Sequence, residues 1–181
     1  IVSDLVFSMD GDQAPVDALL DLAERFDAWL YLDDAHGFGV LNDGRGGLTD
    51  RARTSDRVIY LATLGKAAGV AGAAVAAHES VIDWLIQKAR PYIYTTASPP
   101  LLAACLLESL RQIEAGESRR ARLRSHIARL REGLAGLKLG SLLDSTTPIQ
   151  PLVIGENAEA VRLSQALLAR VAHVAGKALC F

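Results

Sequence analysis

The sequence predicts an α/β domain with a mainly parallel sheet flanked by helices, and two observations lead to this class. First, residues 28–32 and 58–62 are short, continuously apolar runs, which are typical of parallel strands buried in a sheet. Second, amphipathic helical patterns and glycine-rich loops alternate with these runs. Because strands that alternate with helices build parallel sheets, we expect a layered α/β architecture.

The composition is typical of a globular protein. The chain has 181 residues, of which 50% are hydrophobic and 22% charged, and this length is enough for a sizeable core. Its 19 basic and 21 acidic side chains leave a formal net charge of −2. This balance argues against a nucleic-acid partner, and the hydrophobic content excludes the composition of a disordered chain.

We expect neither a membrane segment nor a signal peptide. No apolar run approaches the ~18 residues that a membrane-spanning helix needs, and residues 1–8 lack the basic start of a signal peptide. The two cysteines, Cys105 and Cys180, form neither a CxxC motif nor a disulfide framework. The sequence therefore predicts a cytoplasmic protein without a membrane partner.

Strands and one helix are predicted in the first half of the chain. Residues 1–7 have a strand-like pattern, and a polar turn with a glycine follows them. A proline opens a helix over residues 15–26, in which apolar side chains recur at helical spacing: Val16, Leu19, Leu20, Ala23 and Phe26. The apolar runs at 28–32 and 58–62 are the next strands, and residues 73–77 form a further short strand.

The second half is predicted to be mostly helical. Residues 81–89 place apolar side chains on one face, and residues 99–113 form an apolar helix that should be well buried. A break at residues 115–118 separates these helices from the rest of the chain. Beyond it we expect a long helix, a strand at residues 148–154 and a helix at residues 157–171.

The long helix that follows the break is rich in arginine. Its apolar stripe consists of Leu123, Ile127, Leu130, Leu134 and Leu137, and most of the arginines occupy the other faces. A nucleic-acid surface is one interpretation of these charges. Charges opposite an apolar stripe usually form a solvated helix face, however, and we expect that outcome here.

Polar side chains follow three of the predicted strands at the point where each strand ends. Ser8 follows the first strand, residues 33–36 follow the second, and residues 63–66 follow the third. In parallel sheets, ligands gather outside the carboxyl ends of the strands. Three separate stretches therefore deliver functional groups to the same edge of the sheet.

Two nucleotide-binding motifs can be excluded. Gly37 and Gly39 are followed by Asn42 where a dinucleotide fingerprint needs its third glycine. Gly65 and Lys66 lack the upstream glycine and the downstream hydroxyl residue of a P-loop. The glycine-rich loops therefore serve another purpose.

A metal site is a weaker alternative at the same edge. Asp33, Asp34 and His36 could ligate a metal, and Asp10 and Asp12 could join them. Adjacent residues of an extended strand point to opposite sides, however, so Asp33 and Asp34 should not converge. We predict no metal ligands.

A carboxylate at one strand end and a lysine at the next suit pyridoxal-phosphate chemistry. A lysine such as Lys66 can form a Schiff base, and a fixed aspartate such as Asp33 can hold a protonated ring nitrogen. The cofactor then acts as the electron sink. Each residue alone has a more ordinary explanation, because lone lysines are often solvated and lone aspartates often cap helices.

Taken together, these motifs resemble the α-oxoamine synthase family of fold-type I pyridoxal-phosphate enzymes. The resemblance rests on residues 7–12 (FSMDGD), 32–39 (LDDAHGFG), 44–46 (GRG), 63–66 (TLGK) and 94–100 (YTTASPP). It implies a partial fold-type I transferase fold. Residues 1–114 would be the C-terminal part of the large cofactor-binding domain, and residues 115–181 would begin a smaller α+β C-terminal domain.

The resemblance also implies roles for individual residues. Lys66 would carry pyridoxal 5'-phosphate and remove the α-proton of the amino-acid substrate, and Asp33 would pair with the pyridinium nitrogen. His36 would bond the phenolic oxygen of the cofactor and donate a proton during decarboxylation. Ser8 would also bond the phenolic oxygen. Thr63, Thr95 and Thr96 would contact a cofactor phosphate.

The implied reaction condenses L-alanine with a pimeloyl thioester, carried by coenzyme A or a carrier protein, and releases carbon dioxide. Residues 72–75, 94–100 and 149–155 favour the member of the family that uses these substrates. Thr95 and Thr96 would reach a phosphate across the interface of a homodimer. The alternatives are members that use glycine or serine in place of alanine, and a non-catalytic fragment.

The chain also departs from the family pattern. Members of the family carry a phosphate loop, an aromatic residue and an arginine upstream of the region that matches Ile1, and a proline-rich loop and an arginine downstream of Val171. Residues 172–181 match neither downstream feature. We expect this chain to be a fragment that lacks both ends of the family fold, with exposed apolar faces as a result.

Overall fold

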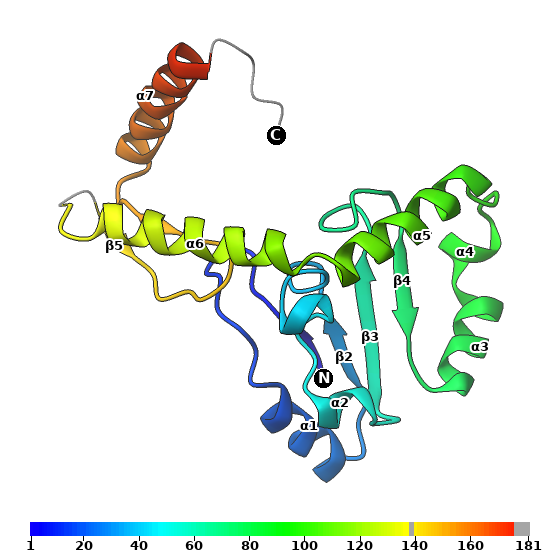
Figure 1. Cartoon of the computed structure of the whole chain (residues 1–181). Helices are drawn as coiled ribbons and strands as arrows, with labels where there is room; N and C mark the ends of the chain where they lie inside the picture. Colours follow the sequence, from blue (N-terminus) through cyan, green and yellow to red (C-terminus); the bar gives the residue numbers. More distant parts are fainter. Residues whose placement is uncertain (138–139, 176–181) are drawn as a thin grey trace.

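The computed structural model describes residues 1–137 and 140–175, and its main feature is a mixed four-stranded sheet (Figure 1). The strands are β1 (Val2–Asp4), β2 (Leu30–Asp33), β3 (Val58–Thr63) and β4 (Ala73–Ala76), in that order across the sheet. β1, β2 and β3 run parallel, and β4 pairs antiparallel with β3. The predicted mainly parallel α/β sheet is confirmed.

Helices and a second, small sheet complete the chain. The antiparallel strands β5 (Ser141–Leu142) and β6 (Leu152–Val153) form the small sheet. The helices are α1 (Val16–Arg25), α2 (Asp50–Arg53), α3 (Glu79–Lys88), α4 (Arg90–Ile93), α5 (Pro100–Glu114), α6 (Glu117–Leu134) and α7 (Asn157–Ala175), with a 3-10 turn at Asn42–Gly44. The strand predicted at 148–154 is therefore only two residues long, whereas the helix predicted at 157–171 is confirmed.

The hydrophobic core lies between one face of the sheet and the two short helices α1 and α2. On β2, Leu30 and Leu32 are completely buried because alternate residues of a strand point to the same face. On α1, the predicted stripe is buried at Val16, Leu20 and Ala23. The core is completed by Leu5, Leu48, Ala52 and Val58.

Burial of the strands is one-sided. Leu30 and Leu32 are buried, but Tyr31 between them is only half-buried and Trp29 is 49% exposed. The expectation of a strand buried on both faces is therefore confirmed on one face and wrong on the other. The residues that the structure describes supply no layer over the second face of β2.

The prediction that residues 99–113 form a well-buried helix is correct for the helix and wrong for its burial. No residue of α5 is buried, and Leu101 and Leu107 are 71% and 61% exposed. The helix contacts the described part of the chain at a few points, such as the hydrogen bond from Ser109 Oγ to the carbonyl of Ala68 (2.6 Å). Its apolar composition predicts a covering surface that lies outside the described residues.

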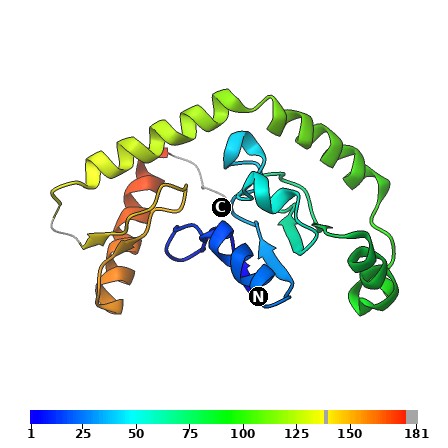
Figure 2. The same cartoon turned by 90° about the horizontal axis from the view of Figure 1, so that it is seen from below.

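α5 and α6 form an arch above the sheet, with α3 and α4 at one end and β5, β6 and α7 at the other (Figure 2). The turn between α5 and α6 coincides with the predicted break at residues 115–118. The division into residues 1–114 and 115–181 stays a prediction. In the described part of the chain, no helix is both long and apolar enough to cross a membrane.

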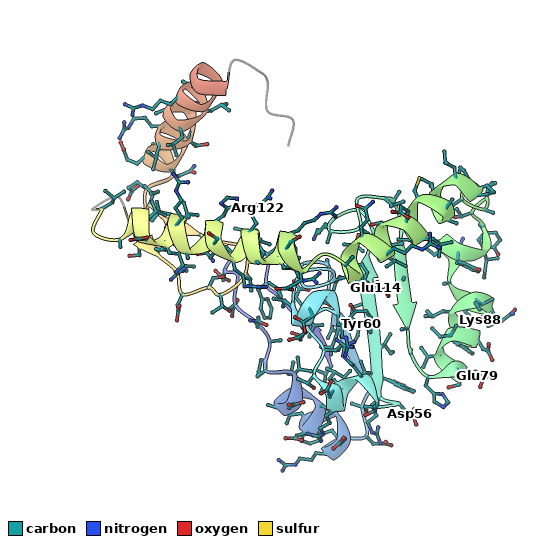
Figure 3. All side chains as sticks on the ribbon, in the orientation of Figure 1. Asp56, Tyr60, Glu79, Lys88, Glu114 and Arg122 are labelled. Carbon is teal, nitrogen blue, oxygen red and sulfur yellow. The ribbon has the colours of Figure 1, made fainter. Side chains whose placement is uncertain are left out.

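The arginine face of α6 is mostly solvated, as predicted, and Arg122 is exposed (Figure 3). Arg120 is the exception, because it is only 7% exposed. Its guanidinium donates to the carbonyl of Ile113 (2.7 Å) and to Glu117 (3.1 Å), and these contacts compensate for its burial. Arg120 therefore fixes the turn between α5 and α6.

Candidate active site

The carboxyl ends of β1 and β2 lie side by side, with β3 next to β2. Asp4 is the register partner of Asp33, and Asp33 pairs in turn with Leu61. The chain leaves each strand in a loop that carries predicted site residues. The expectation that these loops share one edge of the sheet is confirmed.

Ser8 lies in a closed turn that follows β1. The Phe7 amide donates to the carbonyl of Asp12 (3.0 Å), and the Gly11 amide donates to the carbonyl of Phe7 (2.8 Å). Gly11 has a φ of +74°, a left-handed conformation that glycine adopts without strain. The turn leaves Ser8 exposed at the sheet edge.

Lys66 and His36 meet between the loops that follow β3 and β2. Lys66 Nζ lies 2.8 Å from His36 Nε2, within hydrogen-bonding distance. When the lysine carries its proton it can only donate, and His36 Nε2 is then the acceptor with the proton of the neutral imidazole on Nδ1. The structure thus brings the two predicted catalytic residues into direct contact.

The electrostatics of the pair favour a neutral His36. Burial is the first cause that lowers the pKa of His36, and the positive charge of Lys66 is the second. The negative charges of Asp4 and Asp33 oppose these effects without cancelling them. A neutral imidazole is an acceptor and a possible base at neutral pH.

Asp33 ends β2 with its carboxylate half-buried. Its Oδ1 accepts a hydrogen bond from the Ala35 amide (2.8 Å), which fixes the side chain against the turn that leads to His36. Within residues 1–137 and 140–175, no hydrogen bond occupies Oδ2. A second, cationic partner could therefore bind the same carboxylate.

Asp34, which the sequence suggested only as a possible metal ligand, has a structural role. It is 0% exposed, and its Oδ2 accepts from the Tyr60 hydroxyl (2.6 Å) and from the Gly47 amide (2.9 Å). Tyr60 lies on β3 (Figure 3), so the carboxylate joins β3 to the glycine-rich loop after β2. Among the described residues, Oδ1 is buried without a hydrogen-bond partner.

The glycine-rich loop closes tightly around this carboxylate. A Cβ atom at Gly46, whose φ is +88°, would lie 2.0 Å from Asp34 Oδ2, and one at Gly37 would lie 2.2 Å from Oδ1. Burial is the main cause that raises the pKa of Asp34, against the lowering effect of its hydrogen bonds. Burial and the Asp34 contact also raise the pKa of Tyr60. In the sequence, the signal for this buried carboxylate is the pair of aspartates at 33 and 34 followed by several glycines.

The threonines occupy two different places. Thr63 ends β3 beside Ala73 and is half-buried at the same edge as Lys66. Thr95 and Thr96 are exposed in the connection between α4 and α5, beyond β4 and on the far side of the sheet from β1 (Figure 1). The structure therefore does not bring Thr95 and Thr96 to the Lys66 edge of their own chain.

The family model for aminotransferase class I and II matches residues 1–179, nearly the whole sequence. The chain belongs to the aminotransferase class I and II family. Its solved structural neighbours confirm that the fold is part of the fold-type I arrangement of this family.

Similar members of the aminotransferase class I and II family are 8-amino-7-oxononanoate synthases. The enzyme of Thiobacillus denitrificans is 78% identical over 94% of this chain, and 8-amino-7-oxononanoate synthase 2 of Polaromonas sp. is 60% identical over 92%. These matches cover 44% of each relative. The chain thus spans less than half the length of the curated relatives it matches.

Two solved members of the family have similar folds. The 8-amino-7-oxononanoate synthase of Francisella tularensis has a TM-score of 0.80 at 34% identity, over 93% of this chain and 50% of its own. A serine palmitoyltransferase of S. paucimobilis, with PLP and myriocin bound, has a TM-score of 0.83 at 26% identity, over 93% and 44%. Fold similarity alone does not separate the two enzymes.

Replacing Asp34 in this family member should destabilise the fold. In Asp34→Ala the half-buried Tyr60 hydroxyl and Gly47 amide lose their shared acceptor and a buried side chain leaves a void, so we expect a loss of about 2–3 kcal/mol in the free energy of unfolding. Urea denaturation measures this loss. Asp33→Ala is the matched control, with an expected loss of about 1 kcal/mol or less, because its hydrogen bond is local and half-buried. Equal losses in the two variants would contradict the assigned role.

Replacing Lys66 should raise the pKa of His36. In Lys66→Ala the ammonium charge is gone, so the pKa should move up toward its ordinary value, although burial still lowers it. Proton NMR of the imidazole Cε1–H resonance measures the titration, with the His126 signal as the internal reference. An unchanged or lower pKa would show that the contact is not formed in solution.

The lowered pKa of His36 also has a defined effect on stability. As pH falls below the ordinary pKa of histidine, the unfolded chain binds the proton before the folded chain does. The contribution of His36 to stability is therefore complete above the ordinary pKa and is lost as pH falls toward the folded-state pKa.

Proposed function

We propose that this chain forms the lysine-bearing part of an 8-amino-7-oxononanoate synthase. The reaction condenses L-alanine with a pimeloyl thioester of coenzyme A or acyl carrier protein and releases carbon dioxide. The observation that carries the proposal is the contact of Lys66 with His36 (2.8 Å) beside Asp33, at the carboxyl edge of a parallel sheet. The 78% identity to the Thiobacillus denitrificans enzyme supports the choice of substrates.

The donor set at this edge fits pyridoxal 5'-phosphate. Lys66 would hold the aldehyde carbon, and the second carboxylate oxygen of Asp33 would hold the protonated ring nitrogen. His36 and Ser8 would bond the phenolic oxygen, and Thr63 would bond the phosphate. When bound, the cofactor supplies an electron sink for negative charge at the α-carbon of the amino acid.

The proton transfers fall to Lys66 and His36. The amine of Lys66 is the base that removes the α-proton of alanine, and it must reach the substrate in its neutral form. His36 Nε2 is close enough to accept a proton from Lys66 directly, and its lowered pKa keeps this acceptor free at neutral pH. The carboxylate of Asp33 would pair with the ring nitrogen and stabilise its positive charge.

A homodimer would complete the site. Lys66 is exposed in the isolated chain, whereas the chemistry needs a site from which water is excluded. Thr95 and Thr96 lie away from the Lys66 of their own chain, and we propose that they bind the cofactor phosphate of a second copy. The region around them exposes large apolar side chains: Trp84 (65%), Tyr92 (66%), Tyr94 (78%) and Leu101 (71%).

Other α-oxoamine synthases are the alternative function. Serine palmitoyltransferase, 2-amino-3-oxobutyrate CoA ligase and 5-aminolevulinate synthase would use serine or glycine in place of alanine. The fold of the serine palmitoyltransferase is as similar as that of the 8-amino-7-oxononanoate synthase, but its sequence identity is 26% against 34%. The sequence therefore favours alanine, and the amino-acid preference is measurable.

The purified chain should bind pyridoxal phosphate through Lys66. We expect a visible absorption band that is absent in Lys66→Ala, because Lys66 is the one lysine that the described residues place at this edge. Lys88→Ala is the control and should keep the band, since Lys88 is exposed at the end of α3 (Figure 3). L-Alanine should perturb the band at lower concentration than glycine or L-serine. A band that persists in Lys66→Ala, or no band at all, would support the non-catalytic fragment instead.

The chain should form a dimer in solution through the surface around Tyr94 and Leu101. Analytical ultracentrifugation should give twice the chain mass of 19.3 kDa. Leu101→Glu should shift the equilibrium toward monomer, because the charge would be buried at the interface. Leu22→Glu, on the exposed side of α1, is the control. A monomer at all concentrations, or equal effects of the two substitutions, would contradict this interface.

A further inference from the structure

Two buried hydroxyl groups converge on one backbone carbonyl near the candidate site. Ser145 Oγ donates to the carbonyl oxygen of Gly11 (2.8 Å), and Thr147 Oγ1 donates to the same oxygen (2.9 Å). Ser145 is 3% exposed and Thr147 is 0% exposed. We call these two hydroxyls and the carbonyl that they share the hydroxyl clasp. It joins parts of the chain that are 134 and 136 residues apart.

Every hydrogen-bonding group of the hydroxyl clasp can be satisfied. The hydroxyl oxygen of Ser145 accepts the Thr147 amide (3.1 Å), and that of Thr147 accepts the Ile149 amide (3.3 Å). Both hydroxyl protons are then available for the two lone pairs of the Gly11 carbonyl. A buried, satisfied arrangement of this kind specifies one geometry, because any shift leaves polar groups unpaired.

Gly11 leaves no space for a different arrangement. A Cβ atom at this position would lie 2.4 Å from the carbonyl oxygen of Ile149 and 2.5 Å from Ser145 Oγ. The backbone of the turn therefore packs directly against the segment that carries the hydroxyls.

The segment that carries Ser145 and Thr147 is also hydrogen-bonded to α6. Gln150 Nε2 donates to the carbonyls of Ser145 (3.0 Å) and Thr147 (2.6 Å). The amide oxygen of Gln150 accepts from Arg131 Nη1 (2.7 Å), and the same nitrogen donates to the carbonyl of Leu143 (3.0 Å). A continuous set of contacts thus leads from α6 to the turn after β1.

We propose that Ser145 and Thr147 are positioning residues that hold the turn of residues 7–12, and with it Ser8, in place for the cofactor. The turn is closed by its own bonds between Phe7, Gly11 and Asp12, and the hydroxyl clasp is its buried tie to the C-terminal part of the described chain. An exposed hydrogen bond from Gln13 Nε2 to Thr146 Oγ1 (3.2 Å) lies beside it. The position of residues 141–150 therefore sets the position of Ser8. The cofactor part of this inference rests on the proposed function.

The direct test measures the turn itself and needs no cofactor. Thr147→Val keeps the shape of the side chain and removes the hydroxyl, whereas Thr147→Ser keeps the hydroxyl. Hydrogen exchange of the amides in residues 7–12 should become faster in Thr147→Val and stay near wild type in Thr147→Ser. Ser145→Ala should behave like Thr147→Val and replaces it if that variant does not fold. Unchanged exchange in both hydroxyl deletions would overturn the proposal.

A double-mutant cycle tests the link to the cofactor. Loss of one neutral hydrogen bond predicts about five-fold weaker pyridoxal-phosphate binding in Thr147→Val, with recovery in Thr147→Ser. In a Ser8→Ala background the same substitution should have little effect, because the hydroxyl clasp acts through Ser8. An equal loss in both backgrounds would overturn the positioning role and leave the proposed function standing. Absence of the Lys66 band in the wild type would overturn the proposed function, and hydrogen exchange then decides whether the turn is held.

Discussion

The buried carboxylate of Asp34 is the constraint on which the candidate site depends. It has no contact with water, and its two hydrogen bonds join β3 to the glycine-rich loop after β2. The loop can close around it only because Gly37 and Gly46 carry no side chain. His36 lies within this closed segment, so the geometry that brings it to Lys66 follows from a buried carboxylate outside the Lys66–His36 contact.

Two anchors of different kinds therefore hold the site, one on each side. Asp34 fixes the loop that carries His36, and the Gly11 carbonyl fixes the turn that carries Ser8. The lowered pKa of His36 is the electrostatic consequence of the first anchor, since burial and the nearby Lys66 disfavour the imidazolium. The exposed faces of α5 and of β2 belong to a chain that spans less than half the length of its curated relatives.

Much of the fold could be predicted because its signals are local. Apolar runs and helical spacing were sufficient to predict the strands β2 and β3 and the helix α1. The polar residues at the strand ends were sufficient to predict that the site residues share one edge of the sheet. Long-range packing could not be predicted in this way. The role of Asp34 depends on Tyr60, which lies on another strand. The hydroxyl clasp joins residues that are more than a hundred positions apart in the sequence. The apolar composition of α5 predicted burial, but composition does not say whether a covering surface is present.

We propose that the contact with His36 selects Lys66 among the four lysines of the chain, the others being Lys88, Lys138 and Lys177. Borohydride reduction after incubation with less than one equivalent of pyridoxal phosphate, followed by peptide mass spectrometry, measures this selection. We expect a phosphopyridoxyl group almost entirely on Lys66. A label spread over the four lysines would contradict it.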